Sequence, residues 1–523
     1  MTDKKPHHEM EKEVEYLKQR REKALKMGGA DKVARQHKLG KLTARERIAL
    51  LMDQGTFREY GLLANHQSHR AEMADRDAPA DGVITGFGLI NGRRVGVVAE
   101  DFTVMGGSVG ITNGLKKMRM TSIATQERVP LVWLLDGAGA RAEEFIAEGL
   151  PMITHLVNIA RMSGISPSVG ITMGPCAGDS SLVGSLLEFM IMTKGEGMMA
   201  AGGPPVVLRA TGEVVSKQEL GGWKIHCVES GVADNPAEDD VEAINMMKRY
   251  LSYLPSSAYE YPPDVVPDDD PNRMDESLLT VIPDNEAIPY DMKKVINVIV
   301  DKGSFFEIKP EFAKMMITGF ARMNGHVIGI VANQPKVFAG AITAKAAMKE
   351  RHFIDICTAY HVPLVFLVDV PGVMTGPESE KEGALRFGLA VAYSLAHSDV
   401  PKITVVTHKA FGFGGCAMCG YGAGQTLTLA WPRVDFGSIP GGGGVLAAHK
   451  AELEASDNPE ELARQLEEAY KKYSGPYPAA ATFNIDDVID PRETRPRIID
   501  ALELAMCRRT AHPQPAMRWG VMP

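Results

Sequence analysis

The sequence is poor in cysteine, lacks long hydrophobic runs and has no excess of positive charge. Six cysteines in 523 residues are too few for a disulfide-stabilised scaffold and are typical of a reducing compartment. No apolar stretch approaches the roughly 18 residues that a membrane-spanning helix needs. Asp and Glu (66) outnumber Lys and Arg (57), so no overall positive field attracts nucleic acid or anionic lipid. These absences disfavour disulfide-rich, membrane-spanning and DNA-binding proteins.

Targeting signals are also missing. Residues Met1–Arg21 mix acidic and basic side chains, without the apolar core of a signal peptide or the acid-poor composition of a transit peptide. This predicts a cytoplasmic protein. The ordinary balance of hydrophobic (45%) and charged (24%) residues predicts packed cores. The length predicts about two to four domains.

Several familiar catalytic motifs are absent. The sequence contains no phosphate loop G-x-x-x-x-G-K-[ST], no zinc-protease motif H-E-x-x-H and no nucleophile elbow G-x-S-x-G. Cys416 and Cys419 form one C-x-x-C pair, but a zinc site needs a second pair, and the other cysteines are scattered singly. We therefore expect neither ATP hydrolysis nor serine catalysis, and no metal in this chain.

The chain repeats itself. Residues Gly86 to Asp136 align without a gap onto Gly319 to Asp369, at an offset of 233 residues. Upstream, the run from Asp53 to Glu59 resembles the run from Asp301 to Glu307 at an offset of 248, so the first copy has 15 extra residues between Gly61 and Asp81. Copies of about 200 residues are too long for solenoid repeats and indicate a duplicated domain.

A stretch rich in proline and aspartate separates the two copies. Proline cannot donate to a sheet ladder, so this stretch is typical of a linker. We expect an N-terminal domain over residues 1–254, a linker over residues 255–283 and a C-terminal domain over residues 284–523. The residues that define the linker are Pro255, Pro262, Pro263, Pro267, Pro271, Asp264 and Asp268–Asp270.

Each copy alternates short strands with longer helices. Runs that are apolar on both faces are typical of α/β folds with buried, parallel strands. The sequence therefore predicts two tandem α/β domains. Buried strands are predicted at 95–99, 131–135, 327–332 and 364–368, and helices at 113–128 and 344–360.

Four glycine-bearing turns, two per copy, each follow an apolar strand. They are residues 136–141, 174–180, 369–373 and 411–416. Glycine lets a backbone N–H approach a ligand oxygen closely, and amides at a helix start carry the positive end of its dipole. Two such turns facing each other make an oxyanion hole, which stabilises an enolate without a side-chain nucleophile. Tight packing alone explains any single turn, but four matched turns favour backbone chemistry.

Basic residues lie at the start of a predicted helix ahead of the first copy. Thr43 and Glu46 have the spacing of a capping box, which predicts that a helix opens at Ala44. The basic residues nearby, Lys38, Lys41, Arg45 and Arg47, either bind phosphates or form a solvated basic end.

With these features the sequence resembles the carboxyltransferase (β) subunits of biotin-dependent acyl-CoA carboxylases, the propionyl-CoA and methylcrotonoyl-CoA carboxylase family. The resemblance spans nearly the whole chain. It implies two tandem crotonase-like (ββα superhelix) domains, with CoA bound mainly by the first and biotin by the second, in a ring-shaped hexamer that is a trimer of dimers. It is carried by residues 36–47, 101–108, 173–178, 219–222, 330–335, 369–372 and 400–405.

The resemblance implies a reaction that needs no acid or base from the protein. A carboxyl group moves from carboxybiotin to the α-carbon, or the vinylogous carbon, of an acyl-CoA. One oxyanion hole holds the thioester enolate and another holds the biotin carbonyl. By motif match, the thioester amides are those of Gly139, Ala140, Gly178 and Asp179, and the biotin amides are those of Gly372, Val373, Gly414 and Gly415. The implied CoA-binding residues are Lys38, Lys41, Arg45, Gly107 and Arg141.

The resemblance also implies a partner chain. Residues 24–27 and 347–350 are the nearest approaches to the biotin-accepting A-M-K-M, and neither lies in a hairpin context. Biotin is therefore expected on another subunit and not on this chain. We expect a biotin carboxylase or biotin carboxyl carrier subunit as partner and a coenzyme A thioester as substrate, with no nucleic acid, membrane or metal.

The sequence departs from the family pattern at two turns. Gly178-Asp179-Ser180 stands where the family often has Gly-Gly-Ala, and Asp136-Gly137-Ala138-Gly139 stands where it has Asp-Ser-Gly-Gly. A carboxylate of Asp179 that faces the hole would oppose the enolate. Ala417 replaces an acid of the propionyl type, while residues 202–205 resemble the methylcrotonoyl type, so the acyl group stays open.

Three other functions stay open. A biotin-dependent decarboxylase or transcarboxylase subunit would run the same chemistry backwards or between carriers. A catalytically silent subunit that only helps to assemble a carboxylase ring would tolerate the carboxylate of Asp179 beside the oxyanion hole. A crotonase-type hydratase or hydrolase would need an acid or base over the thioester, for which Glu143, Glu144 and Glu148 are candidates.

Overall fold

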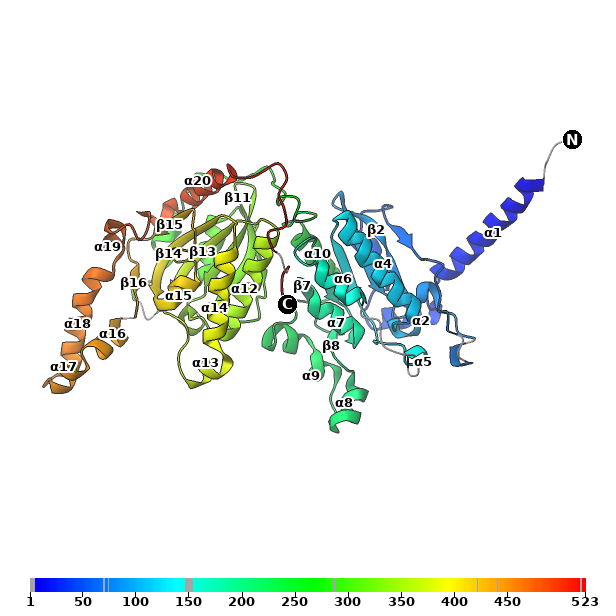
Figure 1. Ribbon diagram of the computed structural model, residues 1–523, viewed down its shortest axis with the longest axis horizontal. Helices are drawn as coiled ribbons and strands as arrows, with labels where there is room; N and C mark the ends of the chain where they lie inside the picture. Colours follow the sequence, from blue (N-terminus) through cyan, green and yellow to red (C-terminus); the bar gives the residue numbers. More distant parts are fainter. Residues whose placement is uncertain are drawn as a thin grey trace. The chain divides into compact units, whose positions relative to one another are not determined.

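The chain folds into two compact α/β units (Figure 1). The first comprises residues Met1–Ser252 and Trp519–Pro523, and the second comprises Tyr253–Arg518. The computed structural model describes residues 5–68, 71–73, 75–145, 154–285, 288–420, 422–439, 441–517 and 520–523. Among the described helices, none is both long enough and apolar enough to cross a lipid bilayer.

The first unit is built on a seven-stranded sheet in the order β1-β2-β3-β4-β5-β7-β9. The first three strands pair antiparallel, and from β3 onward the strands are parallel. A separate two-stranded sheet pairs β6 (Pro175–Ala177) with β8 (Met198–Ala200). The large sheet contains β1 (Arg58–Tyr60), β2 (Val83–Ile90), β3 (Arg93–Glu100), β4 (Leu131–Leu135), β5 (Ser168–Thr172), β7 (Phe189–Thr193) and β9 (Asn235–Ala237).

Helices cover both faces of this sheet, because successive strand residues point to opposite sides. Trp133 and Met190 are fully buried on the face covered by α4 (Ile111–Glu127) and α6 (Thr154–Met162). Phe189 points to the other face and stacks on Tyr250 of α10 (Asp240–Leu251), with ring centroids 3.9 Å apart. The remaining helices of this unit are α1 (Lys5–Leu25), α2 (Ala30–Lys38), α3 (Ala44–Leu51), α5 (Ala142–Phe145), α7 (Asp179–Leu186), α8 (Pro204–Thr211) and α9 (Lys217–Gly221).

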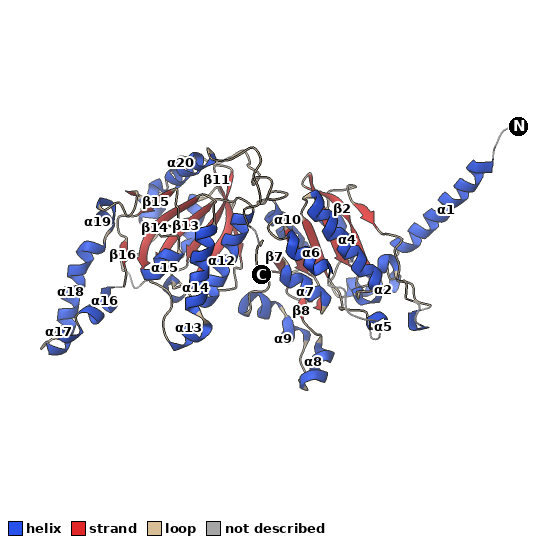
Figure 2. Ribbon diagram, in the orientation of Figure 1, coloured by secondary structure: helices blue, strands red, loops and turns tan. Residues whose placement is uncertain are grey.

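The second unit has the same plan, with helices α12 and α14 lying over strands β13 and β14 in Figure 2. Its sheet has the order β10-β11-β12-β13-β14-β15-β17, and β16 pairs with β14. The strands are β10 (Phe306–Ile308), β11 (Met316–Met323), β12 (His326–Asn333), β13 (Leu364–Val370), β14 (Lys402–Phe411), β15 (Leu427–Ala430), β16 (Asp435–Gly437) and β17 (Asp487–Val488). The helices are α11 (Met292–Ile299), α12 (Ala344–Ala359), α13 (Pro377–Glu382), α14 (Ala384–His397), α15 (Gly412–Ala417), α16 (Gly441–Ala448), α17 (Lys450–Ala455), α18 (Pro459–Ser474), α19 (Pro476–Ala481) and α20 (Thr494–Met506).

The internal repeat is visible residue by residue. Strands β2 and β3 map onto β11 and β12 at the sequence offset of 233, and β1 maps onto β10 at the offset of 248. The extra residues of the first copy lie in the connection from β1 to β2, residues 61–82, which is only 309–315 in the second copy. The predicted pair of α/β domains is therefore confirmed.

Residues 255–283, expected as a linker, belong to the second unit. The Val265 amide donates to the Gly325 carbonyl (3.2 Å), and the Arg273 guanidinium donates to the Val298 carbonyl (2.6 Å). The prolines keep this stretch out of the sheet, but they do not prevent it from packing against its own unit.

The residues after 518 also depart from the expected division, because they join the first unit. The Val521 amide donates to the Ser163 hydroxyl (3.0 Å), which in turn donates to the Val521 carbonyl (2.9 Å). A side chain at Gly520, which has φ +70°, would place its Cβ 2.4 Å from the Ser163 carbonyl oxygen. This segment is therefore closely fitted to the end of α6.

Candidate active site

In the first unit, the turn after β4 meets the turn before α7. Gly139 and Gly178 have φ values of +89° and +57°, which favour glycine. A Cβ at Gly139 would lie 2.6 Å from the Ala177 carbonyl oxygen and 3.7 Å from the Gly178 nitrogen. A side chain at Gly139 would therefore push the two turns apart.

An isolated parallel bridge next to Val109 does not use the amide of Ala140. The Val109 amide donates to the Gly139 carbonyl and the Arg141 amide donates to the Val109 carbonyl, both at 2.8 Å. This alternation turns the Ala140 N–H away from Val109. Asp179 is the first residue of α7, so its amide has no acceptor within the helix. Of the four residues whose amides the resemblance assigns to the thioester, Ala140 and Asp179 thus have N–H groups that these local backbone contacts do not occupy.

The Gly178 amide is not available in the same way. It donates to the Ala200 carbonyl at 3.2 Å, which joins the turn to β8. Gly178 therefore contributes its left-handed backbone, which directs the next amide, rather than a donor of its own.

The second unit repeats the bridge. The Ile342 amide donates to the Gly372 carbonyl (3.1 Å) and the Met374 amide donates to the Ile342 carbonyl (2.9 Å), so the Val373 amide takes no part in this bridge. Val373 matches Ala140 at the offset of 233. A Cβ at Gly414 would lie 2.8 Å from the Gly372 Cα, so the two turns of this unit are also in contact.

The glycine whose backbone corresponds to that of Gly178 is Gly412, which precedes the expected Gly414 and Gly415 by two and three residues. Gly412 has φ +55°, close to the +57° of Gly178. Phe413 then lies in the first turn of α15, whose amides have no acceptor within the helix. Gly415 lies one turn further, where amides bond to carbonyls of the preceding turn. Residues 411–416 contain three glycines, and a positive φ distinguishes Gly412 as the one at which the chain turns.

The carboxylate of Asp179 is bound by two side chains. Its oxygens lie 2.9 Å from Lys117 Nζ and 2.7 Å from His155 Nε2. Burial raises the pKa of Asp179, but the charges and hydrogen bonds of Lys117 and His155 outweigh it and hold this pKa well below its ordinary value. The carboxylate of Asp179 is therefore held in place by His155 and by a lysine that it shares with Glu100.

Glu100, at the end of β3, links the two turns of the first unit. Its carboxylate accepts from the Asp136 amide (2.9 Å), from the Ser180 hydroxyl (2.7 Å) and from Lys117 Nζ (2.8 Å). Asn333 stands at the equivalent position of the second unit, where its side-chain oxygen accepts from the Asp369 amide (3.1 Å). In both units a side chain from the third strand holds the first glycine turn.

The cations expected to bind CoA are engaged inside the first unit, with the exception of Lys38, which is exposed at the end of α2. Gly107 serves close packing, because a Cβ there would lie 2.5 Å from the Asp136 carbonyl oxygen. These contacts differ from the expectation that the cations meet phosphates. Lys41 pairs with Asp136, Arg45 with Glu59, and Arg141 with both Asp81 and Glu144, each at 2.7 Å.

The structure also shows the surroundings of the candidate acid/base residues and of the C-x-x-C cysteines. Glu143 pairs with Arg76 (3.3 Å), Glu144 with Arg141 (2.7 Å), and Glu148 lies outside the described residues. Cys416 is exposed and Cys419 is buried, and burial raises the pKa of the Cys419 thiol to about 12. Within the described ranges, no group of three or more His, Cys, Asp or Glu side chains is placed to hold a metal ion.

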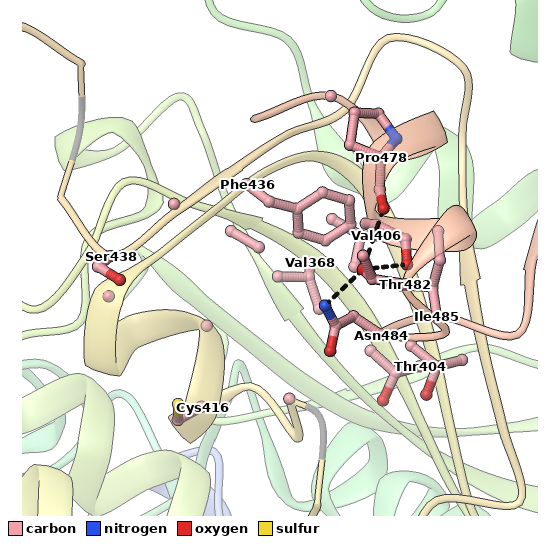
Figure 3. A pocket seen from close by; sticks show the side chains of 18 of the residues that line it. Val368, Thr404, Val406, Cys416, Phe436, Ser438, Pro478, Thr482, Asn484 and Ile485 are labelled. Carbon is pink, nitrogen blue, oxygen red and sulfur yellow. Dashed lines mark hydrogen bonds between the residues drawn. The ribbon is translucent and has the colours of Figure 1, made fainter. Parts of the chain in front are cut away.

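A cavity of about 1000 Å³ opens beside α15 in the second unit (Figure 3). Gly412, Phe413 and Cys416 of α15 form one wall, and the apolar side chains of Phe436 and Ile485 line it further. Its polar groups are few, and some are satisfied locally, since the Thr482 hydroxyl donates to the Pro478 carbonyl (3.0 Å). Such an apolar cavity with a few polar groups is typical of a small-molecule site.

Known proteins resemble this chain over almost its entire length. The carboxyl transferase domain family matches residues 35–518. The chain is 39% identical over 509 residues to the propionyl-CoA carboxylase carboxyltransferase subunit of Haloferax mediterranei, which covers 96% of this chain and 98% of that protein. It is 37% identical over 501 residues to methylmalonyl-CoA decarboxylase subunit alpha of Veillonella parvula, covering 96% and 97%. Transcarboxylase 12S, crystallised as a hexamer with methylmalonyl-coenzyme A bound, superposes with a TM-score of 0.91 at 37% identity and covers 98% of each chain.

Proposed function

We propose a function on the premise that this chain belongs to the carboxyl transferase domain family. The resemblance to carboxyltransferase subunits of biotin-dependent acyl-CoA carboxylases is confirmed, and the two α/β units have the crotonase-like architecture that it implied. The proposed reaction moves a carboxyl group between biotin, carried by a partner chain, and the α-carbon of an acyl-CoA.

The observation that carries this proposal is the pair of matched bridges, Val109 with Ala140 and Ile342 with Val373. In each bridge, two hydrogen bonds hold the residues before and after the central one, whose own amide is not used and lies in a turn that contacts a second glycine turn. Fixed donors of this kind stabilise a developing negative charge without reorganisation, so they favour an enolate over the neutral thioester. In the first unit, the amides of Ala140 and Asp179 would hold the thioester oxygen of that enolate.

The second unit fits the biotin ring, which supplies the activated carboxyl group when bound. Its cavity presents an apolar wall for the fused rings, and Gly412 and Phe413 line it on one side. We infer that the amides of Val373 and Phe413 bind the ureido oxygen. These replace Gly414 and Gly415 as the expected donors.

The anchoring of the Asp179 carboxylate supports an active subunit rather than a silent scaffold. An isolated carboxylate would repel an enolate, whereas Asp179 forms short contacts to Lys117 and His155. Its backbone amide therefore remains useful as a donor.

The direction of transfer has a second candidate. The similarity to methylmalonyl-CoA decarboxylase subunit alpha favours, as an alternative, removal of a carboxyl group from a malonyl-type thioester. Both directions use the same two amide pairs, so the partner subunits would decide between them.

Partners, assembly and location complete the proposal. We infer a biotin carboxylase or biotin carboxyl carrier subunit as partner, because two of the relatives are named as subunits and because no sequence of this chain suits biotin attachment. We also infer a hexamer, as crystallised for transcarboxylase 12S, and a cytoplasmic location, as expected from the sequence.

One experiment tests the reaction and its direction together. The chain is purified with its native partners and supplied with ATP, bicarbonate and a panel of acyl-CoA thioesters, and mass spectrometry identifies which thioester gains a carboxyl group. A parallel assay starts from carboxylated thioesters without ATP. Turnover of an acyl-CoA in the absence of every biotinylated protein would overturn the proposal in favour of a hydratase or hydrolase.

A further inference from the structure

We propose that His155 and Asp179 form an acid–base pair beside the thioester amides, which exchanges an α-proton of a bound acyl-CoA with solvent in the absence of biotin. This activity rests on the proposed function, since it uses the same bound thioester, and it goes beyond carboxyl transfer, since it needs no biotin. His155 is the second residue of α6, and Asp179 is the first residue of α7. These two helices pack against each other (Figure 1).

The imidazole of His155 lies next to a proposed oxyanion donor. Its Nε2 is 2.7 Å from Oδ1 of Asp179, and the backbone amide of that same residue is the one proposed to hold the thioester oxygen. The α-carbon of a thioester is two bonds away from this oxygen. A thioester bound at the Asp179 amide therefore brings its α-protons to the residue on which the imidazole is anchored.

The contacts of His155 determine which ring nitrogen can accept a proton. Lys117 Nζ lies 2.9 Å from the other oxygen of the Asp179 carboxylate and favours its ionised form. An ionised carboxylate only accepts hydrogen bonds, so Nε2 of a neutral imidazole carries the hydrogen and Nδ1 keeps its electron pair. In the part of the chain that the structure describes, Nδ1 forms no hydrogen bond. His155 is therefore available as a base through Nδ1.

The charges around His155 favour uptake of a proton. Glu100 and Asp179 share one cation, Lys117, at 2.8 and 2.9 Å. With a neutral imidazole, this cluster contains two negative charges and one positive charge. Protonation of His155 balances the charges at the moment when negative charge forms on the thioester oxygen.

The cluster reaches the surface at one end. The side chains of Glu100 and Lys117 are completely buried, whereas those of His155 and Asp179 remain 4% and 17% exposed. The buried members hold the carboxylate of Asp179 in a fixed position. The exposed end also contains the first residue of α7, whose amide has no acceptor within the helix. A bound thioester can therefore contact the imidazole but not Glu100 or Lys117.

The second unit lacks this pair at the corresponding place. Phe413 takes the place of Asp179 after the left-handed glycine, and Gly388 follows His155 at the repeat offset of 233. A Cβ at Gly388 would lie 3.1 Å from Cε1 of Phe413, so these two positions also face each other. The duplication keeps the contact between the two positions, but only the thioester side has ionisable groups there. This is the side on which a proton has to leave carbon.

The proposed exchange consumes no reagent. Nδ1 of His155 forms a bond to the α-proton, the C–H electron pair becomes the carbon–carbon double bond of the enolate, and the carbonyl electron pair moves to the oxygen held by the Ala140 and Asp179 amides. The imidazolium exchanges its proton with water. The reverse steps then return a solvent proton to the same carbon, so the acyl-CoA is not used up.

Incubation in D2O tests this inference. The full-length protein, cleared of biotinylated proteins on streptavidin, is mixed with propionyl-CoA, and mass spectrometry follows deuterium at the α-carbon. We expect incorporation of deuterium without loss of thioester. His155→Gln can still donate a hydrogen bond to Asp179 but has no basic nitrogen, so the exchange rate should fall about 100-fold or more. His397→Gln is the matched control with an unchanged rate, because His397 is exposed and bonds only the Tyr393 carbonyl among the described residues.

Asp179→Asn tests the role of the carboxylate while it keeps the backbone amide. The side-chain amide of asparagine can donate to Nε2, which places the imidazole hydrogen on Nδ1 and removes the base. The exchange rate is therefore expected to fall about 100-fold here too. Propionyl-CoA binding, measured by calorimetry, depends on the backbone amide and should change about threefold or less. Loss of binding together with loss of exchange in both variants would show a structural role and overturn the inference.

The failures of the two proposals are distinguishable. If the complete complex carboxylates an acyl-CoA but the isolated chain incorporates no deuterium into that same thioester, the inferred exchange is wrong and the proposed function stands. Equal exchange rates in the wild type and His155→Gln would also overturn the inference. Exchange by the isolated chain without any carboxyl transfer by the complete complex would support the acid–base pair and overturn the proposed function.

Discussion

Lys117 and Glu350 occupy equivalent positions of the internal repeat, and both side chains are fully buried, yet their surroundings are opposite. Lys117 contacts the carboxylates of Glu100 and Asp179 at 2.8 and 2.9 Å. Neither carboxyl oxygen of Glu350 has a hydrogen-bond partner among the described residues. The duplication thus preserves the backbone, while the buried charges of the two units have diverged.

Removal of the Lys117 charge is expected to destabilise the protein strongly. Lys117→Met would leave two carboxylates without their shared cation, and breaking a buried pair of this kind costs about 3–5 kcal/mol. The free energy of unfolding in urea measures the effect. Adding Asp179→Gly to Lys117→Met should recover part of the loss, because one of the two stranded carboxylates is then absent. A strictly additive double variant would contradict the coupling.

Substitution of Glu350 is expected to stabilise the protein, in contrast to substitution of Lys117. Glu350→Met replaces an unpartnered buried carboxyl group by an apolar side chain of similar length, and should raise the free energy of unfolding at pH 8 by about 1 kcal/mol or more. Burial raises the pKa of Glu350 well above its ordinary 4.5. The carboxyl group therefore costs little stability below pH 4.5 and progressively more as the pH rises towards the folded value. Equal stability gains at pH 4 and pH 8 would argue against this origin.

The ionisation of Asp179 is expected to make the free energy of unfolding depend on pH in acid solution. Its folded pKa lies below the ordinary 3.8, so its stabilisation is complete above that pH and is lost as the pH falls further, through the folded value. Asp179→Asn lacks this contribution. Its stability should therefore decline less steeply than that of the wild type below pH 3.8, as followed by denaturant titrations at successive pH values. Parallel curves for the two proteins would show that Lys117 and His155 do not stabilise the carboxylate.

Left-handed glycines at the two turns should be needed for activity. Gly178→Ala and Gly412→Ala strain positions with φ of +57° and +55°, and displace the neighbouring amide. We expect the carboxyl transfer rate to fall about 100-fold in each, as when an oxyanion donor is lost. Gly303→Ala is the control, because it introduces a side chain at φ +72° with no atom within 4 Å of its Cβ. Retained activity in both turn variants would remove the backbone amides from the mechanism.

The sequence predicted the repeated strands and the start of α3, because these features depend on local patterns. The apolar runs in β3 and β12 are continuous, and the capping box at Thr43 and Glu46 forms as expected, with the Thr43 amide donating to the Glu46 carboxylate at 2.7 Å. The sequence could also identify the Ala140 and Val373 amides, since both residues follow a glycine after a buried strand.

The features of the site that the sequence could not predict depend on contacts between residues far apart in the chain. Lys41 carries the charge of a phosphate ligand, but Asp136, which neutralises it, lies 95 positions later. Lys117 and His155 belong to no local motif that would connect them with Asp179. Gly412 could not be distinguished from its neighbouring glycines until the sign of its φ angle was known.

The hydrogen bonds between Val521 and Ser163 bear on how the protein is made. Residues 520–523 are synthesised only after the entire second unit, although they complete the first unit. The first unit therefore cannot acquire all of its native contacts until the second unit has been synthesised. A nascent first unit would have to wait with the end of α6 uncovered, a stage at which a chaperone or a partner chain could compete for the same place.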